Sequence, residues 1–367
     1  MTKAAYIGVN GRARKVKKGY VGVNGKARKI KKAYVGVGGV ARPCWGGGEL
    51  SYYGTITPLS QGRYAHAATT VGGYALFGGG YRERSVDAYN TSLTRSTPTA
   101  LSNRPRSLAA PTVGNYALFG GGYDIDLNNS FLSTVDAYDS SLTRSTPSSL
   151  SIGRRNLAAT TVGGYALFGG GNDNRGNRIN VDAYNSSLTR STPSSLSIGR
   201  RSLAATTVGG YALFGGGDDN RGNSINVDAY DSSLTRSTPS SLSIGRSNLA
   251  ATTVGGYALF GGGSGNAIVD AYDSSLTRST PTALSQARGY LAATTVGNFA
   301  LFGGGAPSSL GSNVVDAYDD SLMRSTPTAL SHDSLSLAAT TVGNYALFGG
   351  GILDGIVSID VDAYTVV

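Results

Sequence analysis

Arginine, tyrosine, asparagine and aspartate residues gather in two short segments that recur along the chain. One segment follows each Gly-Gly-Gly triplet, and the other precedes each Leu-Ala-Ala-Thr-Thr sequence or its equivalent. Planar polar groups and aromatic faces suit carbohydrates or anionic polymers. The alternative is that these segments are solvated loops without a ligand. The candidate binding residues are Arg63, Tyr64, Tyr81, Arg82, Arg84, Arg104, Arg106, Tyr123, Asp124, Arg154, Arg155, Asn174, Arg175, Arg200, Arg201, Asn220, Arg221, Arg246, Arg288 and Tyr290.

The scaffold that must position these residues is a repeat. Residues 157–171 read Leu-Ala-Ala-Thr-Thr-Val-Gly-Gly-Tyr-Ala-Leu-Phe-Gly-Gly-Gly, and close copies occur along almost the whole chain. The phenylalanine of this segment occurs seven times, at intervals of 42 to 49 residues. Repeats of this length form propellers, solenoids or arrays, in which each unit packs its apolar face against the next.

Four segments of one unit have the alternating pattern of short strands, namely 204–208, 211–214, 227–230 and 234–238. No segment carries the apolar stripe of a helix, so an all-β, seven-bladed propeller is predicted. The seventh unit lacks its fourth strand, and residues 53–60 near the N-terminus match the missing piece. We therefore expect an N-terminal strand to complete the last blade and close the ring.

The unit resembles a kelch repeat over roughly residues 50–367, because a hydrophobic strand ends in Gly-Gly, a strand with tyrosine follows, and an outer strand carries arginine. The resemblance implies a kelch-type propeller, although kelch units usually have tryptophan at the arginine position. The arginines are Arg95, Arg144, Arg190, Arg236, Arg278 and Arg324, and each follows an aspartate of its own unit. We predict an ion pair or a hydrogen-bonded bridge that holds neighbouring strands together in each of these six units. Thr55 takes the arginine position in the closing strand, so Asp362 is predicted to lack this partner.

Variation in length falls in one loop of the unit. Between the glycine triplet and the Val-Asp-Ala-Tyr strand lie 5, 12, 9, 9, 5, 9 and 9 residues in successive units. In a four-stranded antiparallel blade, the loop between the second and third strands emerges at the same end as the loop that enters the blade. Both variable loops are therefore predicted to share one face, as is common for binding surfaces on rigid scaffolds.

Residues that could support catalysis or metal binding are sparse. The two histidines, His66 and His332, fall at adjacent blades without an obvious third ligand, and Asp218-Asp219-Asn220 lacks the alternating spacing of a calcium loop. Cys44 is the single cysteine, so no intramolecular disulfide is possible. We predict no catalytic residues, no metal and no cofactor, and hence a protein that is not an enzyme.

Residues 1–48 form a second unit with a different repeat. Three copies of 14 residues, marked by Tyr6, Tyr20 and Tyr34, each predict a small hairpin with a tight turn. This segment has twelve basic and no acidic residues, so residues 49–367 hold the other twenty of the 32 basic residues and all 22 acidic ones. The lysines predicted to serve attachment are Lys15, Lys17, Lys18, Lys29, Lys31 and Lys32.

Three interpretations of the basic segment stay open: non-specific binding to nucleic acid, a solvated surface, and attachment to a larger assembly. Attachment is favoured over nucleic acid because the 14-residue motif resembles short repeats in tail proteins of phages and prophages of Gram-positive bacteria. The segment is also expected to pack on a partner, on other copies of the chain or on the propeller, since small hairpins are unstable alone.

Together these features predict a non-enzymatic phage or phage-derived tail component. Residues 1–48 are expected to dock on other virion or tail proteins, and residues 49–367 to contact a host-surface glycan or protein. Alternatives are a structural decoration or assembly protein, and an intracellular protein-binding scaffold. The sequence shows no signal peptide and no apolar membrane span, so we expect assembly of the particle in the host cytoplasm without membrane insertion.

Overall fold

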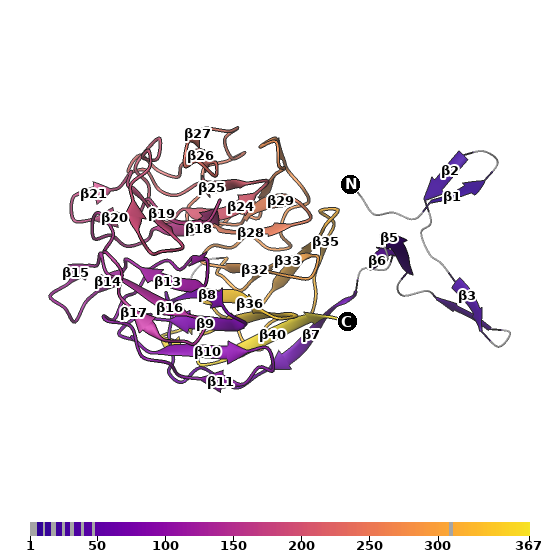
Figure 1. The fold of residues 1–367 in the computed structure, drawn as a ribbon, viewed down its shortest axis with the longest axis horizontal. Helices are drawn as coiled ribbons and strands as arrows, with labels where there is room; N and C mark the ends of the chain where they lie inside the picture. The colour runs from indigo at the N-terminus through magenta and orange to yellow at the C-terminus, as the bar shows by residue number, and fades with distance from the viewer. Residues whose placement is uncertain are drawn as a thin grey trace. The chain divides into compact units, whose positions relative to one another are not determined.

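The computed structural model describes residues 48–307 and 311–367 in full, together with the backbone of six strands within residues 1–47. The described residues form strands and no α-helix, as the predicted all-β fold requires (Figure 1). None of them therefore belongs to a helix that could cross a membrane. The chain divides into two units, Met1–Ser51 with Val366–Val367 and Tyr52–Thr365.

The N-terminal strands form three antiparallel hairpins, which confirms the predicted pattern of the 14-residue repeat. β1 (Tyr6–Val9) pairs with β2 (Arg12–Lys15), β3 (Tyr20–Val23) with β4 (Lys26–Lys29), and β5 (Ala33–Val37) with β6 (Val40–Trp45). The first two hairpins share their register, because each pairs its tyrosine with the last lysine of its second strand. Lys17, Lys18, Lys31 and Lys32 lie outside the described residues.

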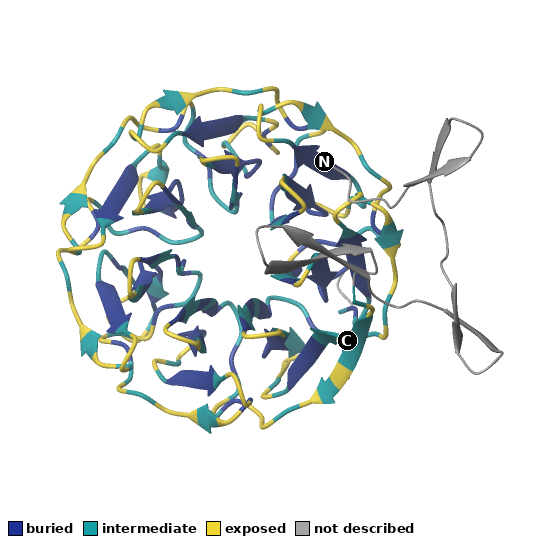
Figure 2. Ribbon diagram, turned by 45° about the vertical axis from the view of Figure 1, so that its right-hand side comes forward, coloured by how far each residue is buried: buried dark blue, intermediate teal, exposed yellow. Residues whose placement is uncertain are grey.

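Seven four-stranded antiparallel sheets form the blades of a propeller, and Figure 2 shows them arranged as a ring. Blades are numbered in chain order, and strands one to four run from the axis outward. Blade 1 comprises β8 (Ala67–Val71), β9 (Tyr74–Gly78), β10 (Val86–Asn90) and β11 (Arg95–Ser96). Blade 2 comprises β12 (Thr112–Val113), β13 (Tyr116–Gly120), β16 (Val135–Asp139) and β17 (Arg144–Ser145). Blade 3 comprises β18 (Ala158–Val162), β19 (Tyr165–Gly169), β22 (Val181–Asn185) and β23 (Arg190–Ser191). Blade 4 comprises β24 (Ala204–Val208), β25 (Tyr211–Gly215), β26 (Val227–Tyr230) and β27 (Arg236–Ser237). Blade 5 comprises β28 (Ala250–Val254), β29 (Tyr257–Gly261), β30 (Val269–Tyr272) and β31 (Arg278–Ser279). Blade 6 comprises β32 (Ala292–Val296), β33 (Phe299–Gly303), β34 (Val315–Asp319) and β35 (Arg324–Ser325).

Blade 7 is completed from both ends of the chain. It consists of β36 (Ala338–Val342), β37 (Tyr345–Gly349), β40 (Val361–Val366) and β7 (Leu50–Thr55). In Figure 1 the indigo strand β7 runs beside the yellow strand β40. The amide of Ile56 also donates to the carbonyl of Val361 at 2.9 Å. The predicted closure by an N-terminal strand is confirmed.

Three of the longer loops between the second and third strands contain a short two-stranded ladder. They are β14 (Tyr123–Asp124) with β15 (Ser130–Phe131), β20 (Asn172–Asp173) with β21 (Gly176–Asn177), and β38 (Ile352–Leu353) with β39 (Ile356–Val357). The ladders give these loops a defined shape, which matters for the residues that they carry.

The apolar core lies between neighbouring blades. At one such interface, Leu213 and Val227 of blade 4 pack against Phe260 and Tyr272 of blade 5. The Tyr272 hydroxyl then donates to the carbonyl of Ser240 at 2.8 Å. The equivalent tyrosine makes the same bond in every blade, so each blade is fixed to the one before it.

The outer strand is shorter than predicted. In blade 4 it begins at Arg236 and not at Leu234, because Leu234 has φ of 64° and belongs to the preceding turn. The Asp231 side chain accepts the amides of Ser233 and Thr235 and closes that turn. In blade 2 the first strand is also short, since Pro111 has no amide to donate to the ladder.

Candidate binding face

In each blade the loop between the second and third strands lies beside the loop that enters the blade. In blade 1 the amide of Tyr81 donates to the carbonyl of Tyr64 at 3.1 Å, and in blade 2 Arg106 and Tyr123 exchange two backbone hydrogen bonds. Equivalent bridges join Arg155 to Asn172, Arg201 to Asp218, Gly289 to Ala306, and Leu335 to Ile352. Both variable loops therefore share one face, as the blade topology predicts, and we call it the variable face.

A closed ring of seven backbone hydrogen bonds surrounds the propeller axis on the variable face. In each blade one amide donates to the carbonyl of its counterpart in the preceding blade, at 2.7–3.0 Å. All seven residues have φ between 53° and 57°, a left-handed conformation that costs about 1–2 kcal/mol for a side chain other than glycine. The residues are Ala65, Ser107, Asn156, Ser202, Asn248, Tyr290 and Ser336. They surround a hollow of about 230 Å³ and fix the position of the residue before each of them.

Five of the predicted binding arginines are buried, so the prediction is wrong for them. Arg63, Arg154, Arg200, Arg246 and Arg288 have no exposed surface. In blade 6, Arg288 is 2.6 Å from Asp316 and donates to the backbone carbonyls of Phe302 and Val314. Burial lowers the pKa of Arg288, and Asp316 opposes that shift. These arginines hold strands together and cannot reach a ligand.

The predicted ion pairs of the outer strands are present in all six units, at 2.9–3.6 Å. In five blades the aspartate therefore receives two arginines, one buried and one in the outer strand, and sequence reasoning missed the buried partner. Asp362 has no arginine partner among the described residues, as predicted. The hydroxyl of Tyr52, and not Thr55, takes the arginine place by donating to Asp362 at 2.6 Å.

Tyrosine rings and guanidinium groups alternate along the variable face over blades 1 to 3. The Tyr64 ring stacks on Tyr81 with centroids 5.2 Å apart. The Arg106 guanidinium lies 5.3 Å from the Tyr81 centroid and 5.4 Å from that of Tyr123. Arg155 follows, 4.7 Å from the Tyr123 centroid. We call these five residues the tyrosine–arginine row, in which cation–π contacts hold each guanidinium in place.

The two arginines of this row have no carboxylate partner in the part of the chain that the structure describes. Among the residues that the structure describes, no carboxylate oxygen lies within 4.0 Å of Arg106 or Arg155. Burial lowers the pKa of Arg155, and the positive charges of Arg106 and Arg201 lower it further. The Arg155 Nε is buried without a hydrogen-bond partner. An anion bound here would relieve this repulsion.

The second blade supports the row through its long loop. Phe131, which sequence reasoning missed, packs on Tyr123 with centroids 5.0 Å apart and lies 5.6 Å from the Arg155 guanidinium. Its place within the longest loop was the available signal. Asp124 is only 5% exposed and accepts the amides of Arg104 and Asp126, so it shapes the loop instead of facing a ligand, against the prediction.

Three further predicted arginines have carboxylate partners. Arg82 also lies over the Tyr81 ring, 5.5 Å from its centroid, but it is 3.8 Å from Asp126, and Arg104 is 3.5 Å from the same side chain. Arg201 lies 3.8 Å from Asp218. The other predicted loop residues, Arg84, Asn174, Arg175, Asn220 and Arg221, are exposed, and Tyr290 is exposed in the ring around the axis. The predicted site is thus a compact row with scattered charged residues around it.

The other half of the variable face is uncharged at the equivalent positions. Ser247, Gly289 and Leu335 stand in blades 5, 6 and 7 where Tyr64, Arg106 and Arg155 stand in blades 1, 2 and 3. Their neighbours across the loop bridges are Ser264, Ala306 and Ile352. At these positions the cationic and aromatic groups therefore occupy one side of the face, and Tyr290 is an exposed aromatic residue on the other side.

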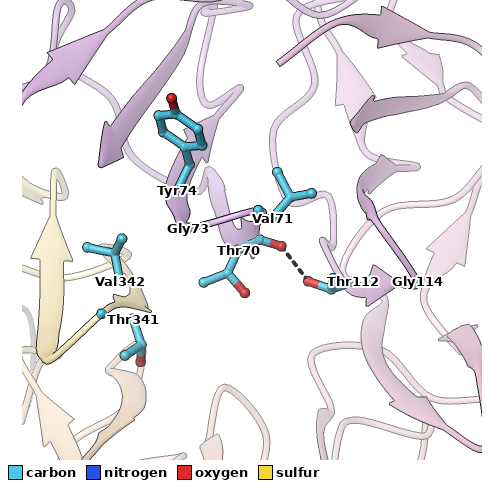
Figure 3. A pocket seen from close by; sticks show the side chains of 10 residues that line it. Thr70, Val71, Gly73, Tyr74, Thr112, Gly114, Thr341 and Val342 are labelled. Atoms are coloured by element: carbon cyan, nitrogen blue, oxygen red, sulfur yellow. Dashed lines mark hydrogen bonds between the residues drawn. The ribbon is translucent and has the colours of Figure 1, made fainter. Parts of the chain in front are cut away.

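The opposite face has a hollow of about 360 Å³ with no charged side chain among its lining residues. Figure 3 shows it between the inner strands of blades 1, 2 and 7, where the Thr112 hydroxyl donates to the carbonyl of Thr70 at 2.8 Å. Thr341 makes the same kind of bond to the carbonyl of Thr295, at 2.6 Å. These hydroxyls tie inner strands together, so this hollow offers less to a ligand than the variable face.

The described residues contain no group of three His, Cys, Asp or Glu side chains that could hold a metal ion. His66 is buried, and neither of its ring nitrogens has a hydrogen-bond partner. His332 is exposed and its Nδ1 lies 3.1 Å from Asp360. The two histidines therefore have separate surroundings.

Fold and site together define a seven-bladed β-propeller with one charged, aromatic side on its variable face. No family model matches the chain, and no curated protein matches its sequence. A solved structure described as "Structure of YjhT" is similar to this chain, with a TM-score of 0.56 at 11% sequence identity. The likeness covers 83% of this chain and 95% of that one. At this identity it shows a shared fold alone.

Proposed function

We propose that this chain is a kelch-like, non-enzymatic binding protein of a phage or phage-derived tail particle. Its variable face contacts a host-surface glycan or protein, and residues 1–48 attach it to other virion or tail proteins. The particle assembles in the host cytoplasm, and the attachment segment can also join copies of the chain.

The observation that carries this proposal is the tyrosine–arginine row. Outer-strand and buried arginines of the propeller pair with aspartates, whereas Arg106 and Arg155 have no such partner among the described residues. The scaffold beneath the row is almost the same in every blade, and the loops above it differ in length and composition. Such a division between constant scaffold and varied loops is typical of binding surfaces.

The attachment role is supported by the separate character of the N-terminal unit. All twelve charged residues within residues 1–48 are basic, whereas the propeller has slightly more acidic than basic residues. Three hairpins of similar length follow one another there. A basic, repeated segment of this kind suits docking on an acidic surface of a larger assembly.

The test is binding of the labelled full-length protein to intact Gram-positive cells. In one variant the second-to-third-strand loops of blades 2, 3 and 4 are replaced by the five-residue loop 264–268 of blade 5. The control variant carries Gly164→Asn on the opposite face, since blade 2 already has Gly-Asn in that turn. We expect saturable binding by the natural protein and the control, and loss of binding by the loop variant at an unchanged Tm.

Absence of cell binding across a broad panel contradicts the recognition role. A structural decoration protein is then the better explanation, and it predicts that deletion of residues 1–48 abolishes incorporation into particles. If neither cells nor particles bind the protein, the intracellular scaffold is favoured, and partners are sought in the cytoplasm.

A further inference from the structure

We infer that the tyrosine–arginine row binds an acidic glycan, with carboxylate or phosphate groups on Arg106 and Arg155 and sugar rings beside Tyr81 and Tyr123. This inference rests on the proposed function and names the class of its ligand. It also restricts binding to the side of the variable face formed by blades 1 to 3.

The protein holds the guanidinium groups of Arg106 and Arg155 in place without using their hydrogen-bond donors. Tyrosine rings flank the Arg106 guanidinium, with centroids at 5.3 and 5.4 Å. A guanidinium carries its N–H donors in its own plane, and neither Arg106 nor Arg155 donates a side-chain hydrogen bond to another described residue. Arg104, by comparison, donates to Asp126. Preorganised, free donors of this kind match the paired oxygens of a carboxylate or phosphate.

The spacing of the row favours a glycan over other polyanions. The Tyr123 ring separates the two guanidinium groups, so charges on a matching ligand must be separated by a neutral group of similar size. An acidic sugar polymer has this alternation of charge and ring. Nucleic acid carries a charge about every 1.7 Å of duplex axis, a closer spacing than that of two guanidinium groups separated by an aromatic ring.

The two sides of the variable face provide an internal comparison. The positions equivalent to Arg106 and Arg155 are Ser247, Gly289 and Leu335 in blades 5 to 7. Because the backbone ring holds all seven positions alike, the difference lies in side chains and not in the scaffold. A ligand that recognises charge and aromatic surface therefore binds over blades 1 to 3.

The experiment measures affinities of the full-length protein by titration calorimetry at about 0.15 M salt, an ionic strength that screens long-range charge effects. The probes are polygalacturonate, its methyl-esterified neutral form, purified wall teichoic acid and inorganic polyphosphate. Comparison of polygalacturonate with its methyl ester isolates the contribution of the carboxylate to binding. Teichoic acid supplies phosphate on a glycan, and polyphosphate supplies charge without a sugar. The test variant is Arg106→Ala with Arg155→Ala.

The matched control is Arg175→Ala with Arg221→Ala, which removes the same charge from exposed loop residues of the variable face. We expect the natural protein to bind polygalacturonate, teichoic acid or both, and not the neutral ester. The test variant should lose at least about tenfold in affinity, the loss expected for a charge-assisted hydrogen bond, and the control less than about twofold. Tyr123→Ala should weaken binding and Tyr123→Phe should retain it, with all variants at the Tm of the natural protein.

Three results overturn the inference: binding to neither acidic glycan, equal binding to polyphosphate and to the glycans, or equal losses in test and control variants. Cell binding that survives Arg106→Ala with Arg155→Ala leaves the proposed recognition role intact and removes only the acidic-glycan assignment. Absence of cell binding by the natural protein removes the recognition role itself.

Discussion

Burial decides what an arginine does in this propeller. Arg106 on the variable face has no carboxylate partner among the described residues. In blade 6 the equivalent of Arg106 is Gly289, and Arg288, one residue earlier, is fully buried against Asp316. A buried cation is stable only when it is paired and hydrogen-bonded. The same residue type therefore serves the scaffold at one position and is available to a ligand at another.

Removal of a buried arginine should cost more than removal of its outer counterpart. Arg288→Ala leaves the fully buried Asp316 without its inner partner, and we expect the free energy of unfolding to fall by about 3–5 kcal/mol. Arg324→Ala removes the outer partner, whose side chain is 26% exposed, and should cost about 1 kcal/mol. Urea denaturation of both variants measures the difference. Equal losses would show that burial does not separate the two roles.

His66 should make the propeller sensitive to mild acid. Burial lowers its pKa well below 6.5, and the nearby positive charge of Arg63 lowers it further. The unfolded chain binds a proton near pH 6.5 and the folded chain does not. The free energy of unfolding should therefore fall below that pH, by at most about 1.4 kcal/mol per pH unit.

The variant His66→Leu tests whether His66 causes this acid sensitivity, and leucine fits because the other six blades have it at the same position. It should flatten the dependence between about pH 6.5 and 5.5, a range above the ordinary carboxylate pKa values. Stability curves measured at several pH values give the slope. An unchanged slope in the variant would assign the acid sensitivity to other groups.

At the scale of strands, the second strand of each blade ends where the next blade packs. A Cβ atom added to Gly169, the last residue of β19, would lie 2.7 Å from the Phe214 ring of blade 4. Gly169→Ala should therefore destabilise the propeller by about 1–3 kcal/mol through overpacking. Phe214→Leu in the same chain should recover part of the loss, and thermal unfolding measures both. If the double variant is no more stable than the sum of the single changes predicts, the contact is not the cause.

The sequence predicts these strands well because each depends on a local pattern that is repeated seven times. Alternation and glycine turns locate the inner three strands of blade 4 to within a residue. The outer strand was predicted too long because leucine gives no sign that Leu234 adopts a positive φ. The closing strand has a further feature that spacing does not reveal: the alignment places Thr55 at the arginine position, but it is the Tyr52 hydroxyl that donates to Asp362.

The candidate site was predicted in part. The topology places both variable loops on one face, and this brought Tyr64, Tyr81, Arg106 and Tyr123 together as expected. The buried arginines could not be separated from exposed ones, because arginine is ordinarily a surface residue. Only the packing of neighbouring blades shows that Arg288 has a carboxylate to meet.

At the scale of the whole molecule, the N-terminal strand β7 closes the ring by completing blade 7, the joint between the two ends of the chain. Leu59 and Phe77 pack there against Val342 and Leu347, in the kind of cluster found between the other blades. A blade that loses its outer strand exposes an edge that can pair with other chains. The joint should therefore control both stability and the oligomeric state.

Deletion of residues 1–60 removes β7 and Leu59, and we expect a propeller that aggregates or unfolds at a lower temperature. Deletion of residues 1–47 keeps β7 and should leave the Tm within a few degrees of the natural protein, because the contacts of the closed blade remain. Light scattering after size-exclusion chromatography gives the oligomeric state, and calorimetry gives the Tm. A monomeric deletion of residues 1–60 with an unchanged Tm would contradict a role for the joint. In that case the contacts between first strands around the axis and the seven-membered hydrogen-bond ring would be sufficient to hold the propeller closed.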